Sequence, residues 1–295
     1  MLDRLGDLPQ EVVLGLGIGA IYGLVAIGFS LIYRTSGLLS FVHPEMVMLG
    51  SLLGYTATTE FDLPIGLAVV PVAVMTGVLA FVIDQIGIRP IRRRRGTLVS
   101  LILATVGWGV VLANAASLVY GANTRAYPDE KSRAWSLLGV EVRWETLAVI
   151  ASALAIAGAL QVFLHRTRPG REVRAVGDDS DTAPLMGIDV ERSMGLSAGI
   201  GGALGGVAGV FIGWLFFAGL TVNTFGLKSL AAAIIGGFGN IPGALIGGLL
   251  IGVLDVQAGV TIDSRWRDAT VFVLVIIVLL VRPRGLFGRR AHVRS

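Results

Sequence analysis

Polar side chains interrupt the apolar stretches of this chain, and five of them are the first candidates for chemistry. They are His43, Glu45, Asn114, Lys228 and Asp255. If those stretches cross a membrane, a charge within them is costly and usually faces a bundle interior, a water-filled cavity or a partner charge. Glu45 and Lys228 lie deep in their stretches, so each either lines a solute path or belongs to a structural ion pair. Asp255 lies nearer an end, where it reaches the interface or pairs with Arg265 or Arg267.

Motifs for catalysis and nucleotide binding are missing from the sequence. It contains no G-x-x-x-x-G-K-[ST] phosphate loop, no H-E-x-x-H zinc motif and no G-x-S-x-G nucleophile elbow. His43, His165 and His292 lie in different segments and predict no metal site. With no cysteine, disulfides, iron–sulfur clusters and thiolate metal sites are excluded. We therefore expect no cofactor and no catalytic centre, which leaves transport, channel activity or a scaffold role.

The composition indicates a polytopic helical membrane protein. Of the 295 residues, 54% are hydrophobic and 15% charged, whereas soluble domains carry about 25% charged residues. The apolar stretches are 12–33, 38–58, 64–86, 97–120, 145–164, 193–219, 225–239, 242–260 and 269–281. Because a membrane helix needs about 20 apolar residues, they predict an all-α bundle of eight or nine transmembrane helices forming a single domain, 1–295. The short, glycine-rich stretch 225–239 is expected to cross irregularly or to re-enter.

Glycines recur at helical spacing in three of these stretches. The recurring sets are Gly15, Gly19 and Gly23; Gly201, Gly205, Gly209 and Gly213; and Gly239, Gly243 and Gly247. Small residues four apart let the backbones of neighbouring membrane helices approach closely. The pattern predicts tight helix packing and favours that role over direct contact with a solute.

The distribution of charge predicts the orientation in the membrane. Three segments are rich in arginine and poor in acids: 89–95, 166–174 and 282–294. Three others hold at least as many acids as bases: 59–63, 121–145 and 261–268. Since cytoplasmic loops carry an excess of Lys and Arg, the arginine-rich segments and the C-terminus are expected in the cytoplasm. An outward N-terminus then requires an odd number of crossings, which favours nine.

Other residues fit the same orientation. Trp135, Trp144 and Trp266 lie in the outward segments, as an interfacial aromatic belt predicts. Asp84 lies close to Arg89 and is expected at the cytoplasmic boundary. Because topology accounts for the net charge of +4, the lipid bilayer is the expected partner and nucleic acid is not.

Two segments are predicted to be interrupted helices. The first is 35–45, where Pro44 lacks a backbone donor, and the second is the glycine-rich segment 236–243. Interrupted helices are tolerated at membrane depth only beside protein or water, and they often line solute paths. For 236–243, a simple loop between two spans is an equal alternative.

One cytoplasmic segment, 165–192, is longer than a tight connection. Pro169 and Gly170 open it, and the acids of 178–181 are expected to cap or begin a short helix. The apolar face of that helix would comprise Ala183, Leu185, Met186 and Ile188. Gly187 is expected to end it. Such a helix suits docking to a partner protein, and a connector lying on the lipid headgroups is the alternative.

Several blocks of sequence resemble one known family, the LivH-type permease subunits of branched-chain amino-acid ABC transporters. The first block reads GLGIGAIYGLVAIGFSLIYRTSGLLSFVHPEMVMLGSL, near the N-terminus. The others are IRPIR at 88–92, RAVGDDSDTAPLMGIDVER at 174–192, LKSLAAAIIGGFGNIPGALIGGLLIG at 227–252, and VRPRGLFG at 281–288. The blocks occur in family order and span almost the whole chain. The chain departs from the family at Pro44, where relatives usually carry glycine between the His and the Glu.

The resemblance implies partners and roles for particular residues. Such a permease pairs with a second, LivM-like permease subunit, two cytoplasmic ATPases and an extracytoplasmic solute-binding protein. Segment 165–192 then corresponds to the ATPase-coupling loop, with Asp178, Asp179, Ala183, Leu185 and Gly187 as its candidate residues. His43, Glu45, Asn114, Lys228 and Asp255 fall where the family commonly carries polar residues, which makes them candidates for the solute path.

The resulting expectation is a multi-pass permease of the bacterial inner membrane that imports leucine, isoleucine or valine. It is not itself an enzyme, because ATP hydrolysis belongs to the partner chains. Urea, short amides or other amino acids are alternative solutes within the family. A different class, an ion-coupled secondary transporter or channel, would need no ATPase and would use its intramembrane charges for coupling.

Overall fold

The computed structural model describes residues 4–128, 134–137, 140–261, 267–282 and 285–287. Within them, every apolar stretch of the sequence is helical. The long and medium helices are α1 (Arg4–Ser36), α2 (Val42–Thr59), α3 (Ile65–Ile83), α5 (Leu98–Tyr120), α6 (Trp144–Arg166), α8 (Val190–Leu215), α9 (Asn223–Gly236), α10 (Ile241–Thr261) and α11 (Arg267–Val281). Six helical segments are long and apolar enough to cross a membrane: 9–36, 65–93, 98–120, 144–166, 190–215 and 241–261. The count of eight or nine spans stays a prediction.

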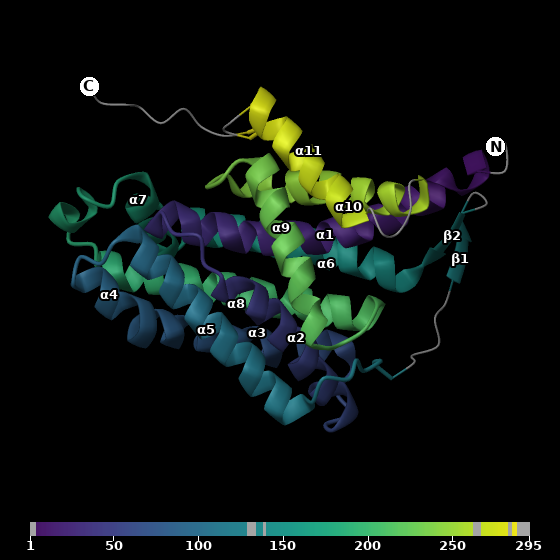
Figure 1. The fold of residues 1–295 in the computed structure, drawn as a ribbon, viewed down its shortest axis with the longest axis horizontal. Helices are drawn as coiled ribbons and strands as arrows, with labels where there is room; N and C mark the ends of the chain where they lie inside the picture. The colour runs from purple at the N-terminus through teal and green to yellow at the C-terminus, as the bar shows by residue number, and fades with distance from the viewer. Residues whose placement is uncertain (1–3, 129–133, 138–139, 262–266, 283–284, 288–295) are drawn as a thin grey trace.

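Short elements join these helices at the two ends of the bundle (Figure 1). They are the π-helix η1 (Asp84–Ile88), α4 (Arg89–Arg93), α7 (Arg168–Asp178), and the 3-10 turns η2 (Ala183–Met186) and η3 (Leu220–Val222). The strands β1 (Ala134–Leu137) and β2 (Val140–Arg143) form an antiparallel hairpin that pairs Leu137 with Val140. The other regular elements of the described residues are helices, as the sequence predicted. The alternating sequence Val-Glu-Val-Arg of β2 suits a strand.

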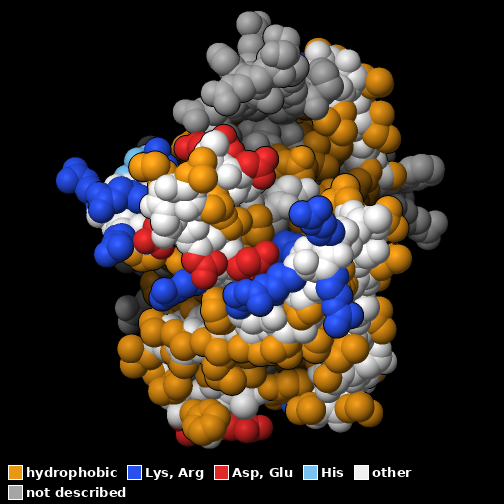
Figure 2. Space-filling view, turned by 90° about the vertical axis from the view of Figure 1, so that its left-hand side faces the viewer, with side chains coloured by type: hydrophobic (Ala, Val, Ile, Leu, Met, Phe, Trp, Pro, Cys, Tyr) orange, Lys and Arg blue, Asp and Glu red, His pale blue; other side chains and the backbone are white. Residues whose placement is uncertain are grey.

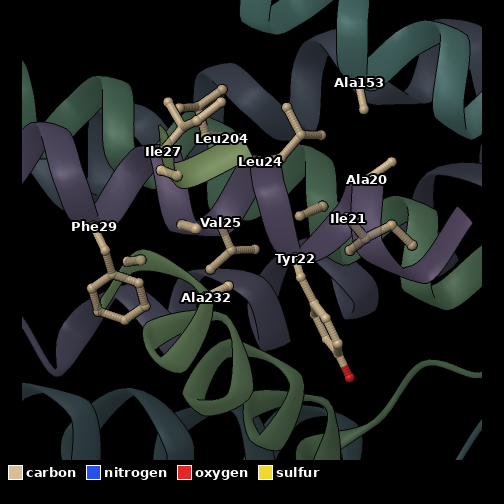
Figure 3. Close-up of a cluster of buried hydrophobic side chains, with 14 of the residues drawn as sticks. Ala20, Ile21, Tyr22, Leu24, Val25, Ile27, Phe29, Ala153, Leu204 and Ala232 are labelled. Carbon is tan, nitrogen blue, oxygen red and sulfur yellow. The ribbon is translucent and has the colours of Figure 1, made fainter. Parts of the chain in front are cut away.

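Helix α1 is the centre of the bundle. Ile21, Leu24 and Ile27 are at most 1% exposed, and Figure 3 shows α1 side chains reaching neighbours on several sides. Those neighbours include Ala153 of α6 and Ala232 of α9, which belong to the same buried cluster. A membrane helix buried on all sides needs small partners, and the glycines of the sequence supply them.

Glycine-to-glycine contacts hold the helices close together, as the spacing predicted. Gly19 and Gly23 of α1 meet Gly248 and Gly252 of α10, so a side chain added at Gly252 would overlap the α1 backbone. In the same way, α2 and α8 meet at Gly50 and Gly206, and α3 and α8 meet at Gly77 and Gly199. Such contacts leave no layer of side chains between the paired helices.

The chain segments predicted to be cytoplasmic gather at one end of the bundle, which we call the arginine end. Here α7 is joined to α1 by an ion pair between Asp178 and Arg34 of 2.7 Å. The segment 285–287 reaches the same end, because the amide of Leu286 donates to the carbonyl of Ile235 and Gly239 packs against Arg34. Arginines 289, 290 and 294 lie outside the described residues. Figure 2 looks onto this end and shows charged side chains across its middle, with hydrophobic side chains below them.

The opposite end, which we call the hairpin end, holds the segments predicted to face outward. Strands β1 and β2 lie there with the N-terminal part of α1 (Figure 1), and Arg125 pairs with Ala218 through two backbone hydrogen bonds of 2.8 Å. Trp144 begins α6 and is 46% exposed. Lys131 and Trp266 lie outside the described residues, as does the side chain of Trp135.

The two interrupted segments have different structures. Helix α1 ends at Ser36, Gly37 has a φ of 65°, and α2 begins only at Val42, so the chain is non-helical between α1 and α2. Pro44 lies in the first turn of α2, where its missing donor does little harm. Segment 236–243 is the loop between α9 and α10, with positive φ at Gly237 and Gly239. That outcome confirms the simple-loop interpretation of 236–243.

Helix α9 connects the two ends of the bundle. The chain just before it, at Gly219, lies against Thr124 of the hairpin end. The chain just after it, at Gly239, lies against Arg34 of the arginine end. The irregular stretch 225–239 therefore runs from one end to the other, as an irregular crossing would.

Candidate functional site

Lys228 and Asp255 form a buried ion pair in the interior. The Lys228 Nζ lies 3.3 Å from Asp255 Oδ1, with side-chain exposures of 13% and 0%. Asp255 also accepts a 3.0 Å hydrogen bond from the Tyr22 hydroxyl, which Figure 3 shows pointing away from the apolar cluster around α1. The pair therefore joins α1, α9 and α10. The expectation that Asp255 reaches the interface was wrong, because its side chain is completely buried.

Glu45 faces a different partner. Its Oε1 accepts a 3.2 Å hydrogen bond from Asn223 Nδ2, across the contact between α2 and α9. Gly226 packs against Pro44 beside them, which brings the starts of α2 and α9 together. The other carboxylate oxygen, Oε2, is buried and has no hydrogen-bond partner among the described residues. Glu45 and Lys228 are thus not partners of each other in this structure.

His43 is fixed between α1 and α2. Its Nε2 lies 3.0 Å from the Val25 carbonyl, and Phe29 packs edge-on against its ring at 4.5 Å. Its Nδ1 has no partner among the described residues, and the side chain lines a cavity of about 20 Å³ together with Ser40 and Gly202. That volume holds roughly one water molecule, so His43 is placed to brace the bundle rather than to meet a solute directly.

Asn114 stands apart from the other candidates. It lies on the outer face of α5, and its side-chain amide donates to the Val110 carbonyl one turn back at 2.8 Å. Gly107, two turns earlier on the same face, has open space where a side chain would be. The five candidates thus form one ion pair, one half-buried carboxylate, one braced histidine and one outward amide, rather than a single cluster.

Tyr127 holds the hairpin end together, and the sequence analysis missed it. Its ring enters the bundle beside Gly54 of α2 and Gly213 of α8, and its hydroxyl donates to the Ser51 carbonyl at 2.9 Å. Burial raises the pKa of this hydroxyl, so it remains a donor. Arg125 lies over the Tyr55 ring at 5.3 Å. The sequence feature that could have pointed to Tyr127 is its place two positions after Arg125 in a polar loop.

At the arginine end, the segment predicted to couple to an ATPase has a defined shape. Helix α7 ends at Asp178, so the acids that were expected to cap or begin the short helix precede it. Asp179 Oδ1 accepts the amides of Asp181 and Thr182 at 3.0 and 3.1 Å in the turn that leads into η2. Gly187 ends η2 with a φ of 76°, as predicted.

The turn η2 presents two apolar side chains to solvent. Leu185 is 83% and Met186 82% exposed, whereas Ala183 is only 4% exposed. The predicted apolar face is therefore split, with Ala183 packed inward and the Leu185–Met186 tip directed outward. Exposed apolar residues at a charged end of a membrane protein are typical of a protein-binding surface.

A second charge cluster at this end was not foreseen. Arg92 donates to Asp84 Oδ1 at 2.9 Å and to Oδ2 at 3.1 Å, and it also donates to Glu191 at 2.9 Å. Asp84 is 4% exposed and pairs with Arg92 rather than lying open at the boundary beside Arg89. Because 99 residues separate Arg92 from Glu191, only the folded chain brings them together.

Among the described residues, no group of three or more His, Cys, Asp or Glu side chains could hold a metal ion. The features that remain are buried charges in an apolar bundle, an apolar tip at the arginine end and tight glycine packing.

Comparison with known proteins gives a consistent result. Residues 12–280 match the family described as "Branched-chain amino acid transport system / permease component". Two similar proteins are the permease BraD of Pseudomonas aeruginosa and the permease LivH of Escherichia coli K12, both named as high-affinity branched-chain amino acid transport proteins. Each is 31% identical to this chain over 95% of this chain and 95% of its own length. The fructose import permease FrcC of Rhizobium meliloti is 28% identical over 89% of this chain and 74% of its own.

One solved structure shares the fold. PsaBC from Streptococcus pneumoniae in complex with Fab superposes with a TM-score of 0.52, covering 97% of this chain and 98% of that one. At 12% identity this likeness concerns the arrangement of helices alone.

Proposed function

Since this chain belongs to the family of branched-chain amino acid transport system permease components, we propose that it imports leucine, isoleucine and valine as the membrane-spanning subunit of an ABC importer. The whole-chain similarity to BraD and LivH carries this proposal. ATP is hydrolysed by two separate cytoplasmic ATPases, and an extracytoplasmic binding protein delivers the solute. The arginine end is the cytoplasmic end, which follows from the excess of arginine in its loops.

Segment 165–192 is the ATPase-coupling loop in this proposal. Its tip is the Leu185–Met186 pair, which is more than 80% exposed at an end that also carries charged groups. Asp178 and Asp179 shape the approach to the tip, and Gly187 returns the chain to α8. An apolar tip held on charged and capped supports suits insertion into a groove on a partner protein.

The outer face of α5 is the contact with the second, LivM-like permease subunit. Asn114 on this face would leave a polar amide in the hydrocarbon if lipid covered it, and polar groups at this depth face protein or water. Gly107 on the same face has no neighbour within 4 Å and would allow another helix to approach closely. A partner helix that packs here would cover both residues.

Glu45 and Asn223 are the residues that we place on the solute path. They lie where the starts of α2 and α9 meet, and Glu45 Oε2 has no hydrogen-bond partner among the described residues. A carboxylate oxygen in that position can accept hydrogen bonds from the ammonium group of an amino acid. Lys228 and Asp255 pair with each other and tie α9, which carries Asn223, to α10.

The test is uptake by the reconstituted complex. The permease pair, the ATPases and the binding protein are placed in liposomes, and uptake of labelled leucine, isoleucine, valine, fructose and urea is compared. We expect uptake of the branched-chain amino acids only, dependent on internal ATP and insensitive to ionophores. Fructose is the competing solute, because FrcC is also a relative. Fructose uptake would overturn the solute, and ion-driven uptake without ATP would overturn the transporter class.

A further inference from the structure

The contacts of Arg92 join two helices that lie far apart in the sequence. Arg92 forms a two-pronged pair with Asp84, at the end of α3, and a second pair with Glu191, in the first turn of α8. We call Asp84, Arg92 and Glu191 the Arg92 clamp. The side chains of Asp84, Arg92 and Glu191 are 5%, 11% and 26% exposed. Paired hydrogen bonds between a guanidinium and carboxylates fix both distance and direction.

The clamp closes over an irregular turn. The five residues of η1 continue α3 as a π-helix, and α4 follows without a break. Single π-helical turns are uncommon and occur frequently at functional sites. Here the π-turn carries Arg92 back towards Asp84, eight residues earlier, so the helix end is fastened to itself and to α8.

The clamp lies next to the exposed tip. Glu191 follows Gly187 by four residues, and Asp189 between them caps α8 by accepting the amide of Arg192 at 3.0 Å. On the other side of the tip, Asp178 is held by Arg34 of α1. The Leu185–Met186 tip is therefore anchored on one side to α1 and on the other side to α3 and α4. The connections between the tip and these two anchors are short, so a displacement of the tip is transmitted to the anchored helices.

Beyond the clamp, α8 and α3 are packed as a single unit. Gly195 of α8 lies against Gln85 and Asp84, and Gly199 lies against Gly77. A side chain added at Gly202 would meet the Thr76 carbonyl at 2.8 Å. Two helices with such contacts cannot slide apart without losing their packing. A displacement of Glu191 therefore moves α3 and α8 together.

We infer that the Arg92 clamp is the joint through which movement of the Leu185–Met186 tip reaches α3, with Arg92 and Glu191 as positioning residues for transport coupling. The inference rests on the proposed function, since it requires an ATPase at the tip. Arg92 and Glu191 touch neither the solute nor the ATPase. Their role is to keep α3 and the start of α8 moving together. Loss of the clamp then uncouples ATP hydrolysis from transport without removing either binding site.

The test removes the contact between Arg92 and Glu191 and compares the effect with the loss of another ion pair at the same end. Glu191→Ala breaks the link to α8 and leaves Arg92 paired with Asp84. Glu172→Ala is the control, because Glu172 lies outside the Leu185–Met186 tip and its 3.5 Å pair with Arg168 stays within α7, at the same end. Each variant is assembled with the ATPases and the binding protein. Basal ATP hydrolysis, solute-stimulated hydrolysis and uptake per ATP are then measured on the same preparation.

For Glu191→Ala we expect unchanged assembly and basal hydrolysis, with solute-stimulated hydrolysis and uptake per ATP reduced about tenfold, a usual size for coupling between sites. Glu172→Ala should behave as wild type. Glu191→Gln keeps an acceptor for Arg92 and should recover part of the loss, which a merely damaged fold would not allow.

A second pair of variants tests the same inference if Glu191→Ala fails to fold. Arg92→Gln combined with Asp84→Asn removes both buried charges at once, and it should uncouple like Glu191→Ala, while Arg93→Gln on the exposed side of the same turn should not. If wild type is stimulated by solute and Glu191→Ala is stimulated equally, the clamp is not the joint. If wild type shows no stimulated hydrolysis at all, the proposed function fails, and this inference fails with it.

Discussion

Replacing Lys228 by methionine should destabilise the bundle strongly, because it removes a cation that is paired with a buried carboxylate. The two charges lie 3.3 Å apart. At an effective dielectric constant of about 20, that distance corresponds to roughly 5 kcal/mol of attraction. The desolvation of both groups offsets much of this energy, but removing one partner of a buried pair still costs about 3–5 kcal/mol. Methionine fills nearly the same volume, so the loss reports the charge rather than a cavity.

The size of the effect is best isolated with a double-mutant cycle. Asp255→Asn removes the second charge and keeps an oxygen that can accept the hydrogen bond from Tyr22. The variant with both changes should therefore be more stable than Lys228→Met alone, with a coupling energy of about 2 kcal/mol or more. Unfolding is measured by titrating the purified subunit in mild detergent with sodium dodecyl sulfate, followed by tryptophan fluorescence.

Additive losses of stability from the two substitutions would refute this prediction. If the double variant loses the sum of the two single losses within about 0.5 kcal/mol, Lys228 and Asp255 do not stabilise each other. A Lys228→Met subunit that is as stable as wild type, but fails in uptake, would instead place Lys228 on the solute path. Glu45→Gln is the control, because Glu45 is only half-buried and pairs with a neutral amide.

Three further predictions follow from other parts of the structure. Glu45→Gln should leave assembly and stability unchanged and lower leucine uptake per complex about tenfold, as loss of a charged hydrogen bond worth about 1.5–3 kcal/mol implies; uptake at the wild-type rate would remove Glu45 from the path. Gly252→Ala should cost about 1–3 kcal/mol of unfolding free energy in the same titration, because the added methyl group overlaps the α1 backbone. The control Gly158→Ala, which has nothing within 4 Å of the added group, should stabilise α6 by up to about 1 kcal/mol. Equal effects of the two substitutions would contradict the close packing of α1 and α10. In sealed cells, a cysteine at Phe61, which is 69% exposed, should react with an impermeant thiol reagent while one at Arg93 should not, and the reverse pattern would invert the orientation.

The helices could be predicted from the sequence because their signal is local. A run of apolar residues bounded by charge is sufficient to define α3 or α5, and the arginine-rich loops were sufficient to predict that segments 89–95 and 166–174 share one end. Glycine spacing likewise predicted close helix contacts, since small residues four apart always form one helix face.

The partners of the buried charges could not be predicted in this way. Asp255 has Lys228 within reach only because α9 and α10 turn back on each other at 236–240, and Arg92 meets Glu191 across 99 residues. Both contacts depend on tertiary packing, which periodicity does not specify. Glu45 could be named from the sequence as a charge within an apolar stretch, but its contact with Asn223 was visible only in the structure. Asn114 shows the opposite case, a polar residue in an apolar stretch that faces away from the other candidates.

The central position of α1 has a consequence for how the protein is made. Helix α1 leaves the ribosome before its glycine-lined partner α10, which begins at Ile241, roughly 200 residues later. At about 5–20 residues per second of synthesis, α1 waits in the membrane for roughly 10–40 s with its glycine face against lipid. It can persist there because a single helix satisfies its own backbone hydrogen bonds. Insertion of α1 and closure of the bundle around it are thus separate events, and a substitution in the glycine face would harm the second event while leaving the first intact.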